Sequence, residues 1–118
     1  MSTTDEDREA ERRLETRVDV DLWVDQHHAS EKTFCRAVDI SPGGLRFDLG
    51  LAHEVGTIVN LRFSLPGDEL PIEVKAEVVG AGWHGNRPVT HLRFVDLSGD
   101  NHVRITRFVE ERGGSAGG

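Results

Sequence analysis

Residues 32–49 read KTFCRAVDISPGGLRFDL, the pattern of two β-strands joined by a tight turn. Phe34, Val38 and Ile40 are expected on one side of the first strand, and the apolar residues of 44–49 alternate with charged ones. The letters SPGG between the two runs fit a turn, because proline presets one φ angle and glycine permits a positive φ. The segment therefore predicts β-structure in the middle of the chain.

The same two-residue period recurs on both sides of this segment. Apolar side chains alternate with polar ones over 18–24, 59–65, 72–78 and 89–95. Six short strands at even spacing predict an antiparallel barrel or sandwich, and a closed barrel is favoured at this size because it leaves no exposed edge. The expected fold class is all-β with a C-terminal helix, built on a six-stranded antiparallel β-barrel.

The period changes near the C-terminus. Ile105, Phe108 and Val109 form an apolar stripe at helical spacing. Ser98 fits the N-cap of this helix, and Gly113 fits its end, because a glycine readily adopts the conformation that closes a helix. A helix is therefore expected between these two residues.

The length of 118 residues suits one domain. Residues 1–11 are almost entirely charged or polar, and 113–118 read GGSAGG. Neither end can bury a core, so we expect a flexible acidic tail over 1–11, one domain over 12–112 and a flexible glycine-rich tail over 113–118.

The composition excludes several classes of protein. There are 21 Asp and Glu against 14 Lys and Arg, for a net charge of −7, which disfavours a protein that coats DNA or RNA. No run approaches 18 apolar residues, so no membrane span is expected. Cys35 is the single cysteine and cannot form an internal disulfide, and the N-terminus has no apolar signal segment, so a cytoplasmic location is expected.

Two short motifs stand out against this background. The first is RRLETR over 12–17, directly before the first strand, and the second is DISPGG over 39–44, at the turn after the second strand. Together they resemble the PilZ domain family, whose pattern is RxxxR before the first strand and (D/N)xSxxG after the second. The matching residues are Arg13 and Arg17 in the first motif, and Asp39, Ser41 and Gly44 in the second.

The resemblance implies a PilZ-type β-barrel with a C-terminal helix, and a site for the bacterial second messenger cyclic di-GMP. Arginine suits this ligand, because its planar fork meets phosphate oxygens in pairs and binds the O6/N7 edge of guanine. A carboxylate accepts hydrogen bonds from the N1 and N2 donors of guanine, and a serine donates to a phosphate. The ligand-binding residues that the resemblance implies are Arg13 and Arg17 for guanine and phosphate with Arg12 assisting, Asp39 for a guanine edge, Ser41 for phosphate or the ligand backbone, and Gly44 for the turn.

A neutral interpretation of the same residues stays open. The arginines of the first motif can be solvated charges paired with Glu9, Glu11 and Glu15, and the second motif can be an ordinary turn. The chain also departs from the family at His91, where many relatives carry a glycine. A bulky side chain at this position either narrows the ligand face or points outward.

The remaining conspicuous residues suggest no catalysis. His27 and His28 are expected in a surface loop, with no further ligand at metal spacing. Cys35 is expected as a small packing residue. A glycine-rich loop is expected over 80–86. Its Trp83 either covers the barrel mouth or presents an exposed ring to a partner, and covering is favoured because a large ring gains most from burial.

Three hypotheses follow for function. The first is a non-enzymatic cyclic di-GMP receptor, without cofactor or metal, that signals through a partner protein in motility, polarity or biofilm regulation, as a monomer or a homodimer. The second is a PilZ-type adaptor that does not depend on the ligand. The third, a barrel for single-stranded nucleic acid, ranks lowest, because the chain has no Tyr and a net charge of −7.

Overall fold

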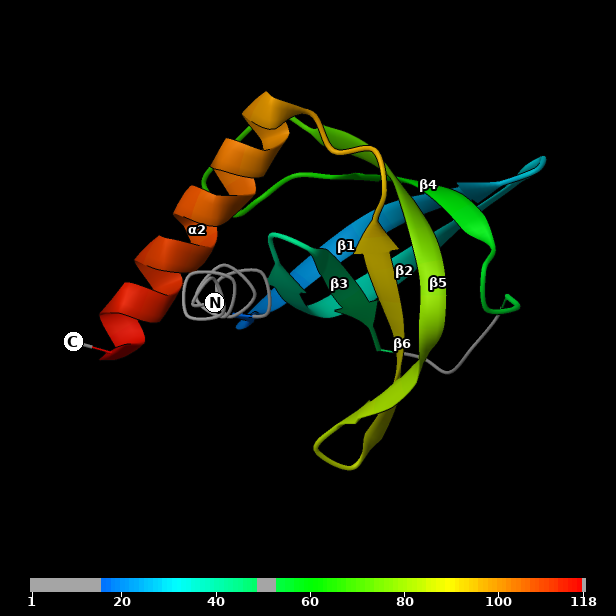
Figure 1. Ribbon diagram of the computed structural model, residues 1–118, viewed down its shortest axis with the longest axis horizontal. Helices are drawn as coiled ribbons and strands as arrows, with labels where there is room; N and C mark the ends of the chain where they lie inside the picture. Colours follow the sequence, from blue (N-terminus) through cyan, green and yellow to red (C-terminus); the bar gives the residue numbers. More distant parts are fainter. Residues whose placement is uncertain (1–15, 49–52, 118) are drawn as a thin grey trace, which may run out of the picture.

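The computed structural model describes residues 16–48 and 53–117. These residues form one closed barrel and one helix (Figure 1). The elements are β1 (Val18–His28), β2 (Glu31–Ser41), β3 (Gly44–Phe47), β4 (Ile58–Phe63), β5 (Ile72–His84), β6 (Arg87–Phe94) and α2 (Gly99–Gly117). The strands are antiparallel and follow one another around the barrel in the order β1-β2-β3-β6-β5-β4. The predicted fold class is confirmed.

The core lies inside the barrel and continues under α2. Alternate apolar side chains of the strands point inward, as the two-residue period predicts, except where a bulge interrupts the alternation. Removing these side chains from water is the main favourable term for folding. The most deeply buried members include Val24, Ile40, Leu45, Phe47, Val59, Ile72, Leu92 and Ile105.

A bulge in β2 changes which side chains point inward. The register of β2 against β3 shifts between Ala37 and Asp39, so the inward series passes from Cys35 and Ala37 to Ile40. Phe34 is consequently 64% exposed and does not share a face with Ile40, contrary to the expectation from the sequence. The same bulge places Asp39 on the outer face of the barrel.

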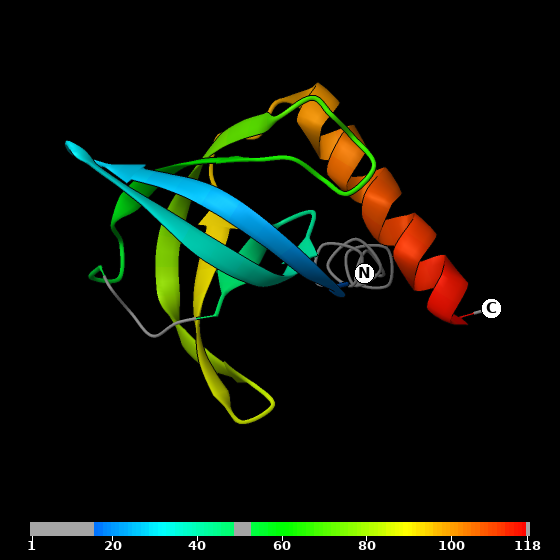
Figure 2. The ribbon, with the colours of Figure 1, turned by 180° about the vertical axis from the view of Figure 1, so that it is seen from behind.

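Two hairpins are longer than the sequence pattern predicts. β1 continues through His27 and His28, which were expected in a loop, and turns at Ala29 with a positive φ of 56°. β5 and β6 pair as far as His84 and Arg87, over most of the predicted glycine-rich loop. Both hairpins project from the barrel in two views (Figures 1 and 2).

The longer second hairpin determines the position of Trp83. This residue is part of β5 and lies opposite Pro88 of β6. Its side chain is 69% exposed, so the expectation that it covers the barrel mouth is wrong. The physical reason is that cross-strand pairing carries this part of the hairpin beyond the core, where little apolar surface is available to bury the ring.

The helix α2 lies beside the barrel (Figure 2). Its N-terminus is capped as predicted, because Ser98 Oγ accepts a hydrogen bond from the Asn101 amide at 3.2 Å. α2 continues past Gly113 to Gly117, over residues expected to form a flexible tail. Glycine permits a helix to end but does not force it to end. Each glycine within a helix costs about 1 kcal/mol relative to alanine, and the helix can continue at that cost. None of the described helices is long and apolar enough to cross a membrane.

Candidate ligand-binding site

The site is centred on Asp39, near the end of β2. Asp39 pairs with Asp19 of β1 on one side and with Arg46 of β3 on the other. Its side chain is only 1% exposed, although it lies on the outer face of the barrel. A buried carboxylate on an outer face requires partners that replace water.

Three side chains supply those partners. Arg46 Nε donates to both oxygens of Asp39, at 3.0 Å from Oδ1 and 2.7 Å from Oδ2. Arg17 Nη1 donates to Oδ1 at 3.1 Å. His84 Nδ1 lies 3.4 Å from Oδ2, and its other ring nitrogen lies 3.9 Å from the Asp19 carboxylate. Two guanidinium groups and an imidazole thus surround one carboxylate.

These neighbours determine the ionisation of Asp39. Burial by itself raises the pKa of this carboxyl, but the hydrogen bond and charge of Arg46, together with Arg17 and His84, outweigh burial and lower the pKa below its usual value. Asp39 therefore stays a carboxylate at neutral pH, able to accept hydrogen bonds from a ligand that replaces one of its partners.

Ser41 shapes the turn that follows Asp39. Its hydroxyl accepts a hydrogen bond from the Gly43 amide at 3.2 Å and donates to the Gly44 carbonyl at 3.4 Å. The side chain is buried, so in this conformation it holds the turn closed and does not face solvent. This is the side-chain to backbone bonding of the neutral interpretation, and the phosphate contact implied by the resemblance stays a prediction.

Gly44 is required for a different reason than the one expected. It begins β3 and is not among the glycines with positive φ. A Cβ atom at this position would come within 2.0 Å of the Leu92 carbonyl oxygen on β6. Glycine is needed here because β6 approaches closely, and turn geometry does not require it.

His91 is the cross-strand neighbour of Arg46, on the β6 side. Its Nε2 atom is buried and has no hydrogen-bond partner among the described residues. Burial lowers the pKa of the His91 ring, and the charges of Arg17 and Arg46 lower it further, while Asp39 opposes them. The ring is therefore neutral at pH 7.

The structure brings together part of the predicted site. Arg17 meets Asp39, although 22 positions separate them in sequence. Arg12 and Arg13 lie outside the described residues. Arg46 is a plausible additional contact from the sequence but was not included in the predicted site, and His84 was not predicted. Arg46 could have been found from its outward place between Leu45 and Phe47, but His84 gave no signal, because its segment resembled a loop.

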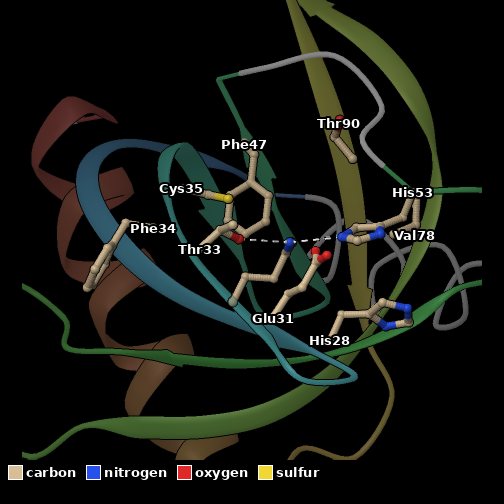
Figure 3. Close-up of a pocket in the computed structure, with 10 residues that line it drawn as sticks. His28, Glu31, Thr33, Phe34, Cys35, Phe47, His53, Val78 and Thr90 are labelled. Atoms are coloured by element: carbon tan, nitrogen blue, oxygen red, sulfur yellow. Dashed lines mark hydrogen bonds between the residues drawn. The ribbon is translucent and has the colours of Figure 1, made fainter.

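A separate cavity of about 330 Å³ lies near the end of β1 and the start of β2, away from Asp39 (Figure 3). Cys35, Phe47 and Val78 form its apolar wall. At its polar side the Gln26 amide nitrogen lies 3.1 Å from His53 Nε2 and 3.4 Å from Thr33 Oγ1. Among the predicted site residues that the structure describes, none lines this cavity.

The fold and the cluster around Asp39 define the class of protein. It is a small closed β-barrel domain that carries a group of charged side chains on its outer face. The family model described as the PilZ domain matches residues 11–111. The chain therefore belongs to the PilZ domain family, and the resemblance drawn from its two motifs is confirmed.

Solved structures of low sequence identity share the fold. The inhibitor of motility MotI/DgrA of Bacillus subtilis matches with a TM-score of 0.74 and 21% identity, over 85% of this chain and 50% of that one. YcgR from Escherichia coli, solved in complex with c-di-GMP, gives 0.67 and 16%, over 85% and 45%. PlzA of Borreliella burgdorferi, also in complex with c-di-GMP, gives 0.61 and 9%, over 95% and 57%.

The chain thus spans about half the length of these proteins. At such identities the likeness establishes the fold and leaves the ligand and the partners of this chain to be argued from its own residues. None of the curated proteins matches the sequence.

Proposed function

We propose that this chain binds cyclic di-GMP at the corner formed by Arg17, Asp39 and Arg46, and passes the signal to a partner protein without catalysis. One observation carries the proposal: a carboxylate that is 1% exposed on the outer face of the barrel, held between two arginines. This is the donor and acceptor set that a guanine with a neighbouring phosphate requires.

Binding on this corner is an exchange of partners. Asp39 accepts a guanine edge only if one of its present donors moves away. Arg17 is the donor placed to move, because it precedes β1, whereas Arg46 lies within a strand paired on both sides. When it leaves Asp39, the Arg17 guanidinium turns to a phosphate or a guanine of the ligand. This is a population shift between two pairings of the same charges.

The family gives independent support for this choice of ligand. The motif residues Arg17, Asp39, Ser41 and Gly44 lie within the matched range and within one corner of the barrel. YcgR and PlzA, which share the fold, were solved with c-di-GMP bound. Contacts from Arg12 and Arg13 are part of the same proposal and rest on the motif.

Calorimetric titration of the full chain with cyclic di-GMP tests the proposal. We expect micromolar or tighter binding, lost in Arg17→Ala and in Asp39→Ala. The matched control is Arg62→Ala, because Arg62 is an exposed arginine on the outer face of β4, away from the corner. Absence of binding at tens of micromolar in a folded sample would refute the proposal.

A second candidate function is an adaptor that works without the nucleotide. The observation in its favour is that Asp39 already has its hydrogen bonds supplied by Arg17 and Arg46, so the corner is stable without a ligand. If the chain is such an adaptor, the Arg17→Ala protein should retain its cellular function although nucleotide binding is lost. The downstream pathway, in motility, polarity or biofilm regulation, and the cytoplasmic location stay predictions in both cases.

A further inference from the structure

His91 has an unusual position beside the proposed site. It is opposite Arg46 in the pairing of β3 with β6, and opposite Gly80 in the pairing of β6 with β5. Its Nε2 is enclosed and has no partner within residues 16–48 and 53–117. Buried polar atoms nearly always have a partner in folded proteins, so an unpaired ring nitrogen in a ligand corner calls for a reason.

We infer that His91 is a further ligand-contact residue of this corner, and that it takes up a proton when a phosphate ligand binds, so that its Nε2–H donates to a phosphate oxygen. This inference rests on the proposed function. It goes beyond the motif residues, because His91 belongs to neither motif.

The charges around His91 explain why the proton is absent before binding. Arg46 of β3 and Arg17 ahead of β1 outnumber the carboxylate of Asp39, which leaves one net positive charge in the corner. These two cations, together with burial, hold the pKa of His91 below its usual value. A protonated ring would add a second net positive charge to a desolvated site.

The other charged groups near this part of β6 are already paired. Arg93, two residues further along β6, forms an ion pair with Glu77 of β5. His84 of β5 lies between the carboxylates of Asp39 and Asp19. Neither pair supplies a partner to the His91 ring.

Ligand binding reverses this balance. The two phosphates of cyclic di-GMP bring two negative charges, which change the corner from one net positive to one net negative charge. An imidazolium beside them is then favoured, and it forms a charge-assisted hydrogen bond that the neutral free state lacks. By linkage, a site that gains a proton on binding has a higher affinity at lower pH, by at most about tenfold per pH unit for one proton.

Calorimetric titration with cyclic di-GMP in buffers of different ionisation enthalpy counts the protons taken up. We expect uptake approaching one proton per site near pH 7 and an affinity that rises by more than about tenfold, and at most about 100-fold, between pH 8 and pH 6. His91→Gln keeps a neutral hydrogen-bonding side chain that cannot titrate, so its binding should take up no proton and be nearly independent of pH. His102→Gln is the matched control, because His102 is exposed on α2 and is not part of the corner, and it should retain the uptake of the wild type.

The outcomes separate this inference from the proposed function. Wild-type binding without proton uptake overturns the role of His91 and leaves the receptor proposal standing. Equal uptake in His91→Gln and wild type also overturns it, as does loss of uptake in His102→Gln alone. Absence of wild-type binding at every pH overturns both proposals. The wild-type proton count provides a test even if a variant folds poorly.

Discussion

Arg46 of β3 lies directly opposite Asp39 of β2 and donates from Nε to both of its carboxylate oxygens, at 3.0 and 2.7 Å. This pair joins two neighbouring strands at the corner that also contains Arg17. The carboxylate expected to recognise a ligand is therefore also part of the structure that holds the barrel together. Affinity at this corner and stability of the fold should respond to some of the same substitutions.

The first prediction concerns the loss of Arg46. Arg46→Ala leaves a buried carboxylate with fewer donors, which should lower the free energy of unfolding by about 2 to 3 kcal/mol; the partial exposure of Arg46 keeps the loss below that of a fully buried pair. Urea denaturation measures the change. Arg36→Ala is the control, because its pair with Asp21 is at the surface and should contribute little. Equal losses in both variants would contradict this view of the corner.

The second prediction concerns acid stability. The pKa of Asp39 lies below its usual value in the folded protein, so the unfolded chain binds the proton more readily. The contribution of Asp39 to stability is therefore present above about pH 4 and lost as the pH falls through the folded-state pKa. Unfolding free energies between about pH 5 and pH 2 should fall less steeply in Asp39→Asn than in the wild type. Parallel pH profiles would show that Asp39 is not the group responsible.

The third prediction tests the close approach of β6 to Gly44. In Gly44→Ala the added Cβ meets the Leu92 carbonyl oxygen at 2.0 Å, and backbone atoms cannot move aside easily. We expect a loss of about 3 kcal/mol or more, seen as a lower melting temperature. In the control Gly82→Ala the new Cβ meets Val89 Cγ2 at an ordinary 3.7 Å, so stability should be nearly unchanged. A Gly44→Ala protein as stable as this control would show that β3 and β6 are further apart.

The fourth prediction concerns the start of α2. Ser98→Ala removes the acceptor of the Asn101 amide and should destabilise the protein by about 1 kcal/mol. Ser98→Asp keeps a side-chain acceptor and adds a negative charge at the helix N-terminus, so it should match or exceed wild-type stability. Thermal unfolding followed by circular dichroism compares the two variants. If both lose stability equally, the cap does not contribute as the structure indicates.

The sequence predicted the fold well because the spacing of apolar residues within one segment is enough to identify a strand or a helix. Alternation over Val18–Val24 and the helical spacing of Ile105, Phe108 and Val109 each identify an element without knowledge of its neighbours. The bulge after Ala37 and the long β5–β6 hairpin escaped prediction, because both depend on pairing between strands and not on the sequence of one strand.

The site was predicted only in part, because motifs along the chain reveal some of its residues while others are brought in by strand pairing and packing. Arg17 and Asp39 were found through motifs, and the structure brings them to 3.1 Å. His84 reaches Asp39 across 45 positions of sequence, through a hairpin that looked like a glycine-rich loop. The unpaired Nε2 of His91 is a property of packing that no spacing along the chain reveals.

The most direct test of the central claim is a titration of the ¹⁵N-labelled protein with cyclic di-GMP, followed by amide chemical shifts. We expect saturable changes concentrated at Arg17, at Asp39 and in the following turn as far as Arg46. The β1–β2 turn near Ala29, at the other end of the same two strands, should change little. Changes confined to that far end, or no changes at a saturating excess of the dinucleotide, would contradict it.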